Sequence, residues 1–341
     1  MPADDFRHVA GAAAAPAGIY DADIVILALN RADETLEAIA SALGQNGCRF
    51  HLFILDQGSA PESLARLAAA VNGRADATLV ASGQNLGVAG GRNLASALGH
   101  GRIIIGLDND ASFATSSTVA RAVAVFDTTA DMGAIGFRIV RHDNGQEDLS
   151  SWGYPAGLLP RAGDAFDAAT FVGAGHAIRR AAWDQAGGYD AALFFCWEEF
   201  DFCLRAIALG WRIRYRGDIV IRHKVSPEQR VGWNANRWSY FVRNRLYIER
   251  KLDRSWIALT PRIAAYLLKG ARNRLLVQTV RAILAAADMA PRSTARAMPR
   301  AGLSYLTRND RAHRGSLLSR LLREALGRIG APSNAVSEEK R

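Results

Sequence analysis

Short apolar runs alternate with segments of helical spacing along the first third of the chain. The runs lie at residues 23–30, 50–59, 77–82 and 103–110. Each is nearly continuous in apolar residues until its last positions, which is typical of strands that are covered on both faces. The segments between them repeat apolar residues every three or four positions, as amphipathic helices do. This alternation predicts an α/β fold with a mostly parallel central sheet and helices on both faces.

The second part of the chain predicts less regular elements. A helix is expected over residues 117–127 and a strand over residues 132–140. Residues 171–190 predict a short strand and a helix that ends at two glycines, and residues 194–211 predict a helix with an acidic start. Residues 212–226 alternate polar and apolar side chains, so we expect a strand, a turn and a second strand there.

Composition divides the chain into four parts. Residues 1–21 are rich in Ala, Gly and Asp, which predicts a flexible leader, and residues 22–228 hold the α/β pattern. Residues 229–330 predict a basic, helical C-terminal extension, and residues 331–341 have the composition of a disordered tail. Proline lacks the amide that an interior helical position donates, so the extension should be broken at its prolines. The expected breaks are at Pro261, Pro291 and Pro299.

The positive charge is concentrated in the last quarter of the chain. The whole chain carries a formal charge of +9, whereas residues 250–341 hold 19 Lys and Arg against 6 Asp and Glu. Such a basic region suits an anionic partner, either a membrane surface or a phosphorylated substrate. An oligomer interface is an alternative use of the same helices. No aromatic RNA-binding motif accompanies the charge, so we expect no nucleic-acid partner.

Other features of the sequence favour a cytoplasmic protein. The three cysteines form no CxxC pair, which indicates neither a disulfide framework nor a zinc site. The start of the sequence does not have the pattern of a signal peptide. No window offers about 18 uninterrupted apolar residues, so we expect no membrane-spanning helix.

Two carboxylates close the fourth apolar run, where Asp108 and Asp110 flank Asn109. Asp is a poor strand former and is costly to bury, so these charges call for a partner. Mg²⁺ and Mn²⁺ prefer such hard oxygen ligands and share them with substrate phosphates. The structural alternative is an ordinary turn, because Asp and Asn favour turns.

The other runs also end in polar residues, which include Asn30 and Asp56. Ligands of parallel sheets bind beyond the carboxyl ends of the strands, so we expect these side chains to line one site. The glycine-rich segment 85–93 could bring backbone close to a nucleotide, and Arg92 within it offers a forked donor to phosphate. A tight strand-to-helix turn is the alternative explanation for these glycines.

Three acids lie within four residues at the start of the helix predicted over 194–211. Glu198, Glu199 and Asp201 could include a general base, or they could only stabilise the first helical turn. Their aromatic neighbours favour a functional role. His223 ends an alternating strand and could bind a metal or a phosphate, although a lone histidine is often structural.

Taken in order, these segments resemble the inverting family 2 glycosyltransferases of the GT-A fold, over about residues 22–250. The resemblance is carried by several motifs in the order and spacing of that family. Within the family, the chain resembles rhamnosyltransferases. The motifs are ILDQGS, NLGVAGGRN, LDND, WEEFDFCLR, IVIRH and FVRNRLYI.

The resemblance implies a role for each candidate residue. The general base would be Glu199 or Glu198, and Asp201 would orient the site or bind the acceptor. A Mg²⁺ or Mn²⁺ ion would be held by Asp108, Asp110 and His223. The residues expected to bind the nucleotide-sugar are Asn30, Asp56, Asn85, Gly87, Arg92, Asn93 and Asp108.

The activity implied by the resemblance is sugar transfer with inversion. The donor would be a nucleoside-diphosphate sugar, most simply UDP- or dTDP-linked, and the acceptor a glycan or a lipid-linked hydroxyl. The product would belong to a cell-surface polysaccharide or glycoconjugate, made in the cytoplasm or at the inner face of the cell membrane. Two alternatives remain: a nucleotidyltransferase-like enzyme, and a non-catalytic nucleotide- or glycan-binding protein on the same fold.

Overall fold

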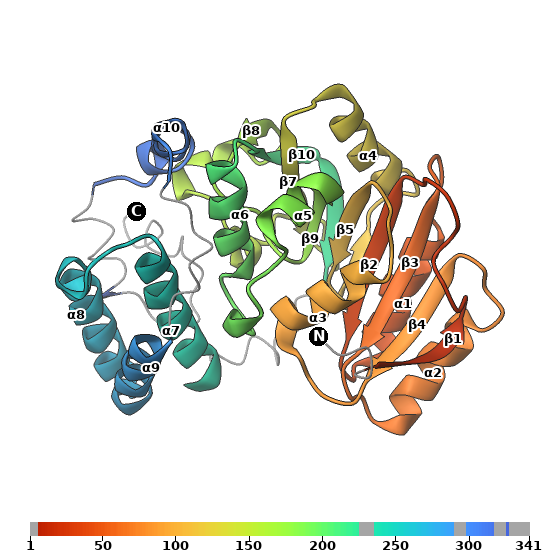
Figure 1. Cartoon of the computed structure of the whole chain (residues 1–341), viewed down its shortest axis with the longest axis horizontal. Helices are drawn as coiled ribbons and strands as arrows, with labels where there is room; N and C mark the ends of the chain where they lie inside the picture. The colour runs from red at the N-terminus through yellow and green to blue at the C-terminus, as the bar shows by residue number, and fades with distance from the viewer. Residues whose placement is uncertain (1–5, 225–234, 290–297, 317–324, 327–341) are drawn as a thin grey trace.

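The computed structural model describes residues 6–224, 235–289, 298–316 and 325–326 (Figure 1). Its strands form one ten-stranded sheet in the order β1-β4-β3-β2-β5-β9-β7-β10-β6, with β8 paired to β10. The strands are β1 (Phe6–Gly11), β2 (Ala22–Ala28), β3 (Phe50–Asp56), β4 (Ala77–Ser82), β5 (Ile103–Leu107), β6 (Ala111–Phe113), β7 (Met132–Arg141), β8 (Ala165–Asp167), β9 (Gly175–Arg179) and β10 (Arg212–His223).

Helices cover both faces of this sheet, as predicted. One face packs against α1 (Ala32–Leu43), α2 (Pro61–Val71) and α4 (Thr118–Thr128). The other face packs against α3 (Gly87–Ala97), α5 (Arg180–Ala186) and α6 (Glu198–Ala208). Short 3₁₀ turns occur at Leu149–Ser151 (η1), Ala156–Arg161 (η2), Ala191–Leu193 (η3) and Arg311–His313 (η4).

The four apolar runs form the parallel part of the sheet, β4-β3-β2-β5. Side chains of β2 alternate between the two hydrophobic cores: Ile24 and Ile26 face α1 and its neighbours, while Val25 faces α3 and α6. Burial on both faces explains why these strands are continuously apolar. The later strands add antiparallel pairs, with β9 inserted between β5 and β7, and one further parallel pair between β7 and β10.

The predicted flexible leader is wrong for residues 6–11, which form the edge strand β1. This strand pairs antiparallel with β4, from Phe6 opposite Ser82 to Gly11 opposite Thr78. Gly11 has φ of 79°, and a Cβ there would strike the carbonyl of Ala77, so the pairing requires glycine. The open edge of β4 supplies the partner that stabilises β1, and leader composition does not reveal such an edge.

Two local predictions also need correction. Strand β10 runs through the expected turn, with a register shift between Arg216 and Val220, so the second strand is a bulged continuation of the first. Helix α8 (Trp256–Arg272) continues through Pro261. The proline cannot donate to the carbonyl of Ile257, but the hydroxyl of Thr260 does so at 2.8 Å, which compensates for the missing amide.

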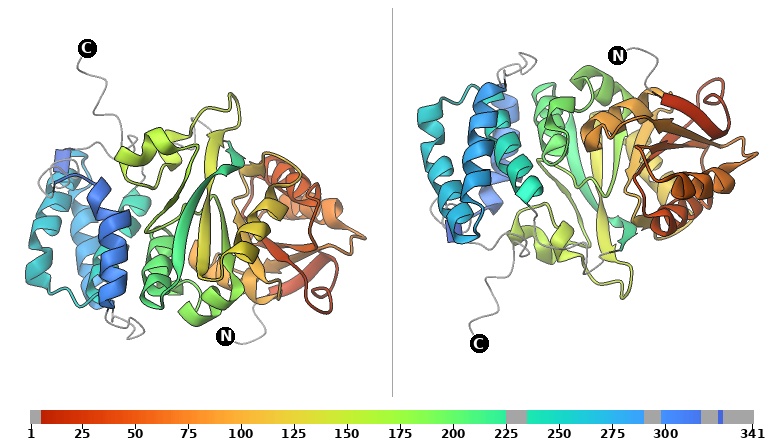
Figure 2. Two further views of the ribbon diagram at one scale, coloured as in Figure 1. Left: turned by 90° about the horizontal axis from the view of Figure 1, so that it is seen from above. Right: turned by 90° about the horizontal axis from the view of Figure 1, so that it is seen from below.

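The C-terminal extension is helical in its described part, as predicted (Figures 1 and 2). Helices α7 (Ala235–Lys251), α8 and α9 (Leu276–Asp288) enclose a small core of their own, and α10 (Arg300–Asn309) packs on α6 through Leu306. Pro299 directly precedes α10, whereas Pro291, the boundary at residue 228 and the tail 331–341 lie outside the described residues. Among the helices that can be described, none has the length and apolar content needed to cross a bilayer.

Candidate active site

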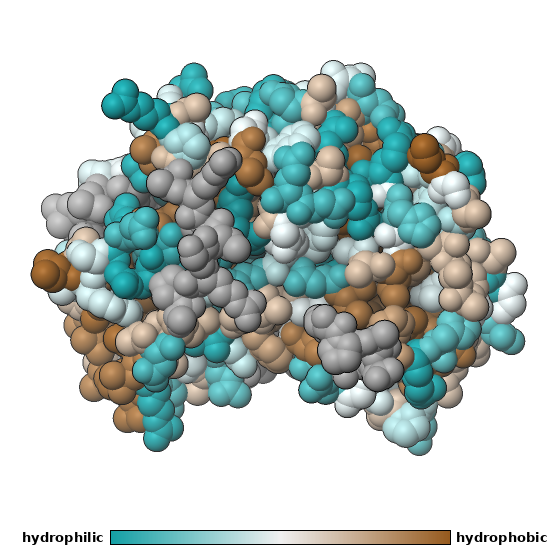
Figure 3. Space-filling view, viewed as in Figure 1, coloured by the Kyte–Doolittle hydropathy of each residue, from teal (hydrophilic) through white to brown (hydrophobic). Residues whose placement is uncertain are grey.

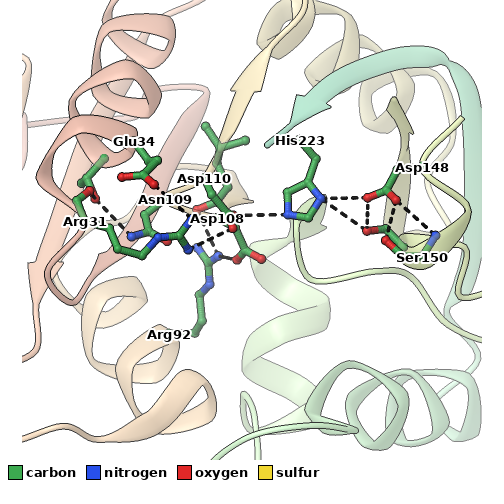
Figure 4. A network of polar contacts seen from close by, with 12 residues as sticks. Arg31, Glu34, Arg92, Asp108, Asn109, Asp110, Asp148, Ser150 and His223 are labelled. Atoms are coloured by element: carbon green, nitrogen blue, oxygen red, sulfur yellow. Dashed lines mark hydrogen bonds and ion pairs between the residues drawn. The ribbon is translucent and has the colours of Figure 1, made fainter. Parts of the chain in front are cut away.

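The two acids that follow β5 meet arginines from separate elements. Arg92 of α3 binds Asp108 at 3.0 Å between Nη2 and Oδ1. Arg31, which precedes α1, binds Asp110 at 3.1 Å between Nη1 and Oδ2. Figure 4 shows both pairs converging beside Asn109, at the carboxyl end of β5. The site therefore lies where parallel α/β sheets bind ligands.

His223, at the end of β10, links this cluster to a third acid. Its Nε2 lies 3.3 Å from Oδ1 of Asp110, and its Nδ1 lies 2.9 Å from Oδ2 of Asp148 (Figure 4). Asp148 is buried, and it also accepts hydrogen bonds from the hydroxyls of Ser150 and Ser151. The sequence analysis missed Asp148, because it lies in an irregular loop with no motif around it.

Charges within this cluster stabilise one another. Burial opposes the positive charge of His223, but hydrogen bonds to Asp110 and Asp148 raise its pKa to about 10. Burial also opposes ionisation of Asp148, yet the hydrogen bonds from His223 and the two serines hold its pKa below the usual range. The pair therefore consists of an imidazolium and a carboxylate at neutral pH.

The donor groups here fit a divalent cation in their chemistry. Asp110 and Asp108 offer hard oxygens, and Asp148 fixes Nδ1 of His223 so that Nε2 faces Asp110, as carboxylates do behind metal-bound histidines. The geometry is not preformed: in the described part of the chain, no three His, Cys, Asp or Glu side chains are already arranged to hold a metal. Asp108 instead faces Arg92.

Arg92 and Asn93 are hydrogen-bonded to other parts of the protein. Arg92 is only 3% exposed, and its guanidinium donates to the carbonyls of Val25 and Leu107 as well as to Asp108. Asn93 exchanges two 2.8 Å hydrogen bonds with the backbone of Tyr189. These bonds position both side chains, and their contacts with a nucleotide stay a prediction.

The remaining predicted nucleotide residues lie on turns at the ends of β2, β3 and β4. Asn30 has φ of 55° and accepts from the amide of Ala60, which ties two of these turns together. Asp56 is buried, and its Oδ1 accepts from the amides of Gly58 and Ser59, while its Oδ2 has no hydrogen-bond partner among the described residues. A buried acceptor without a partner is costly, so it favours a donor supplied by a ligand.

Asn85 and Gly87 shape the start of α3. The side chain of Asn85 accepts from the amide of Gly87 at 2.8 Å. Gly87 has φ of 70°, and a Cβ there would meet Phe194, so glycine allows the loop before α6 to approach α3. The amide of Val88 then donates to the carbonyl of Phe194 at 2.7 Å. This contact joins the glycine-rich turn to the acidic helix.

Glu198 and Glu199 differ in their surroundings. Glu198 is 3% exposed, its Oε2 has no hydrogen-bond partner in the described residues, and burial raises its pKa well above the usual range. Glu199 is half-buried, and burial raises its pKa to about 7. Its Oε1 approaches Gly173, next to Ala174, whose carbonyl accepts from the amide of Asp108. Glu199 therefore reaches the turn before β9 that also anchors Asp108.

Asp201 lies in a buried ion network. Its carboxylate binds Arg205 at 2.9 Å and Lys251 at 2.7 Å. Lys251 also binds Asp190, at 3.0 Å. This network joins α6 to α7, and the role of Asp201 in orienting the site or binding the acceptor stays a prediction.

The loop before α6 is held by a residue of the FVRNRLYI motif for which no role was predicted. Phe194, Cys196 and Trp197 all have positive φ, which is uncommon for residues other than glycine. Nδ2 of Asn244, in α7, lies 2.8–2.9 Å from the carbonyls of Leu193, Phe195 and Cys196. Asn244 thus fixes the backbone that leads into Glu198 and Glu199.

Two protein-family models match the chain. A model described as "Glycosyl transferase family 2" matches residues 23–186, and one described as "Glycosyl transferase family group 2" matches residues 157–295. The chain belongs to the family 2 glycosyltransferases. An uncharacterized protein of Haemophilus influenzae is 28% identical to this glycosyltransferase over 179 residues, which are 48% of this chain and 90% of the relative.

Solved structures share the fold of this glycosyltransferase at low identity. A mannosyltransferase from Pyrobaculum calidifontis, PcManGT, has a TM-score of 0.52 at 18% identity and covers 92% of this chain and 88% of its own. GalNAc-T7 has a TM-score of 0.55 at 14% identity, over 79% and 55% of the two chains. TarS of S. aureus, residues 1–349, has a TM-score of 0.51 at 13% identity, over 90% and 79%. The fold is therefore GT-A, as predicted.

Proposed function

We propose that this glycosyltransferase transfers a sugar from a nucleoside-diphosphate donor to an acceptor hydroxyl in one inverting, metal-dependent step. The observation that carries the proposal is the placement of Glu199. Its carboxylate approaches Gly173, one residue before the carbonyl that anchors Asp108 at the end of β5. A base on α6 and a metal-binding acid at β5 would thus serve the same reacting centre.

The chain's own residues supply the proton transfer in this scheme. Glu199, with a pKa of about 7, would take the proton of the acceptor hydroxyl as that oxygen attacks the anomeric carbon. Glu198 stays protonated at neutral pH, because burial raises its pKa well above the usual range, so it is unsuited to act as the base. A single displacement inverts the anomeric configuration and needs no covalent sugar–enzyme intermediate.

Asp110 would hold the cation, together with Asp108 once that side chain exchanges Arg92 for the metal, and with His223 once its Nε2 has lost the proton that it shares with Asp110. A bound Mg²⁺ or Mn²⁺ would neutralise the charge that develops on the leaving diphosphate. Two structural neighbours support a metal of this kind, since the PcManGT structure is described with GDP-Man and Mn²⁺ and that of GalNAc-T7 with UDP, GalNAc and Mn²⁺.

The proposal also includes the sugar, the donor and the acceptor. A hexosyl or rhamnosyl group is transferred from a UDP- or dTDP-linked donor to a glycan or lipid-linked acceptor of a cell-surface glycoconjugate. The cytoplasmic face of the membrane is the place where such an acceptor and a soluble donor meet. A nucleotidyltransferase-like enzyme would instead require a nucleoside triphosphate, and a non-catalytic binding protein would show no turnover at all.

Binding and turnover test separate parts of this proposal. Wild-type protein, Asp110→Asn and Glu199→Gln are titrated with UDP, GDP, dTDP, ADP and CMP, each with Mn²⁺ or with EDTA. We expect one diphosphate to bind to wild type only when Mn²⁺ is present. Asp110→Asn should lose this Mn²⁺-dependent binding, and Glu199→Gln should bind as wild type does. Transfer from the matching sugar nucleotide should fall by about two to four orders of magnitude in Glu199→Gln. Metal-independent binding, or a fully active Glu199→Gln, would contradict the scheme.

A further inference from the structure

Helices α8 and α9 expose a continuous set of apolar side chains. Along α8, exposed apolar residues recur every three or four positions over four turns, so they lie on one face of the helix. Helix α9 shows the same pattern. Figure 3 shows hydrophobic residues gathered at the lower left, where Figure 1 places these two helices. We define the α8/α9 face by its exposed apolar residues, which are Ile257, Pro261, Ala264, Leu268, Ala271, Leu276, Val277, Val280, Leu284 and Ala287.

These exposed apolar residues do not belong to the small core that α7, α8 and α9 enclose. Leu259, Tyr266 and Ala282 fill that core from the opposite sides of the same helices. Ile257 is nevertheless 83% exposed and Leu284 is 61% exposed. Amphipathic helices of a soluble protein usually turn a polar face to water, so an apolar outer face indicates a partner that covers it.

Charge identifies the kind of partner. Residues 254–288 contain six Lys and Arg and one acid, Asp288 at the end of α9. Arg272 and Arg281 are exposed, lie beside the apolar stripes by helical spacing, and have no acidic partner in the described part of the chain. An apolar face bordered by arginines, with a single acid at one end, is the composition of a helix that lies on an anionic lipid surface.

We propose that the α8/α9 face docks on an anionic membrane surface, with its apolar residues among the acyl chains and its arginines among the phosphates. A second copy of the chain is a poorer occupant, because a two-fold contact would bring the same basic face against itself, with Asp288 as the single acid of α8 and α9 to compensate. The proposal goes beyond sugar transfer, and it would hold for either outcome of the nucleotide-binding test.

Vesicle flotation tests this proposal on the full chain. Vesicles of neutral phosphatidylcholine are compared with vesicles that contain 30% phosphatidylglycerol, at low and high salt. We expect binding only to the anionic vesicles, weakened by salt, with a loss of about fivefold for each arginine in Arg272→Gln and Arg281→Gln. Ile257→Glu combined with Leu284→Glu should abolish binding.

A matched control separates this face from exposed apolar residues elsewhere. Ile19 is 80% exposed in the segment between β1 and β2, so Ile19→Glu changes a comparable side chain and should leave vesicle binding intact. The circular dichroism spectrum and the melting temperature of each variant should match those of wild type, which shows that they fold. A wild-type dimer that Ile257→Glu with Leu284→Glu converts to monomer, with no vesicle binding, would overturn the proposal, as would a monomer that binds neither vesicle.

Discussion

Two adjacent glutamates at the start of α6 occupy different electrostatic environments, and this difference has kinetic consequences. Glu198 is enclosed by protein and remains neutral, whereas Glu199 is half-buried with a pKa raised to about 7. A general base works in its deprotonated form, and its pKa in the free enzyme appears in the pH profile of kcat/KM. The choice between the two acids, which sequence alone leaves open, is therefore open to measurement.

We predict that kcat/KM rises tenfold per pH unit on the acidic side and levels off above a pH of about 7, because Glu199 must lose its proton before it can accept another. Glu198→Gln imitates the neutral acid, so it should keep this acidic limb. Glu199→Gln should remove most of the activity and the limb together. A profile that is flat from pH 5 to 8 in wild type would show that another group is the base.

Asp148 acts on the site through His223, which makes it a positioning residue. Replacing it by Asn keeps the shape but removes the charge that fixes Nδ1 of the imidazole. We expect Asp148→Asn to weaken Mn²⁺ binding by about 10–100-fold, as measured by isothermal titration calorimetry. Asp143→Asn is the control, because that acid is 60% exposed and pairs with Arg141 at the end of β7, and the side-chain contacts described for it do not include His223. Unchanged Mn²⁺ affinity in a folded Asp148→Asn would limit Asp148 to supporting its own turn.

At the scale of elements, the sequence predicts what periodicity controls and misses what tertiary partners control. The parallel strands were predictable because both of their faces are buried, and the ends of β2, β3 and β5 carry the predicted polar residues. Strand β1 was not predictable, since its stability comes from the free edge of β4. Likewise, only the folded chain shows that the arginine in the glycine-rich turn points inward to Val25 and Leu107.

The loop between η3 and α6 is an element whose conformation depends on a distant helix. Its residues of positive φ are unfavourable in isolation, and Asn244 from α7 offsets this by donating to carbonyls of the same segment, those of Leu193, Phe195 and Cys196. We expect Asn244→Ala to lower the free energy of unfolding by about 2–4 kcal/mol, since it leaves the carbonyls of Phe195 and Cys196 without this donor, whereas that of Leu193 still accepts from Arg243.

The same variant should also reduce transfer, because this backbone sets the position of Glu199. Urea denaturation and initial rates under saturating donor measure the two effects. Asn273→Ala provides the comparison, since that amide contacts only one backbone carbonyl among the hydrogen bonds described for it, at the end of α8, and should cost less. A variant that is destabilised but fully active would separate the loop from catalysis.

At the scale of the whole molecule, a buried ion network connects the catalytic part to the C-terminal helices. Lys251, the last residue of α7, is 6% exposed. It binds Asp190, which lies before α6, and Asp201, which lies within α6. The described helices after residue 234 are therefore anchored beside the proposed base, and the α8/α9 face is attached to the site by the same contact. Membrane docking and catalysis would then depend on one interface within the chain.

We predict that Lys251→Met lowers the free energy of unfolding by about 3–5 kcal/mol, because it leaves two buried carboxylates without their shared cation. Arg254→Met is the matched control: Arg254 is 48% exposed and pairs with Glu249, and loss of such a surface pair costs at most about 1 kcal/mol. Guanidinium denaturation of both variants measures the difference. If the network couples the two parts, Lys251→Met should also unfold in two resolved transitions, with the helical part melting first, whereas Arg254→Met should keep the single transition of wild type. Equal stability of the two variants would mean that Arg205 alone suffices to neutralise Asp201, and that the helices are held by apolar contacts.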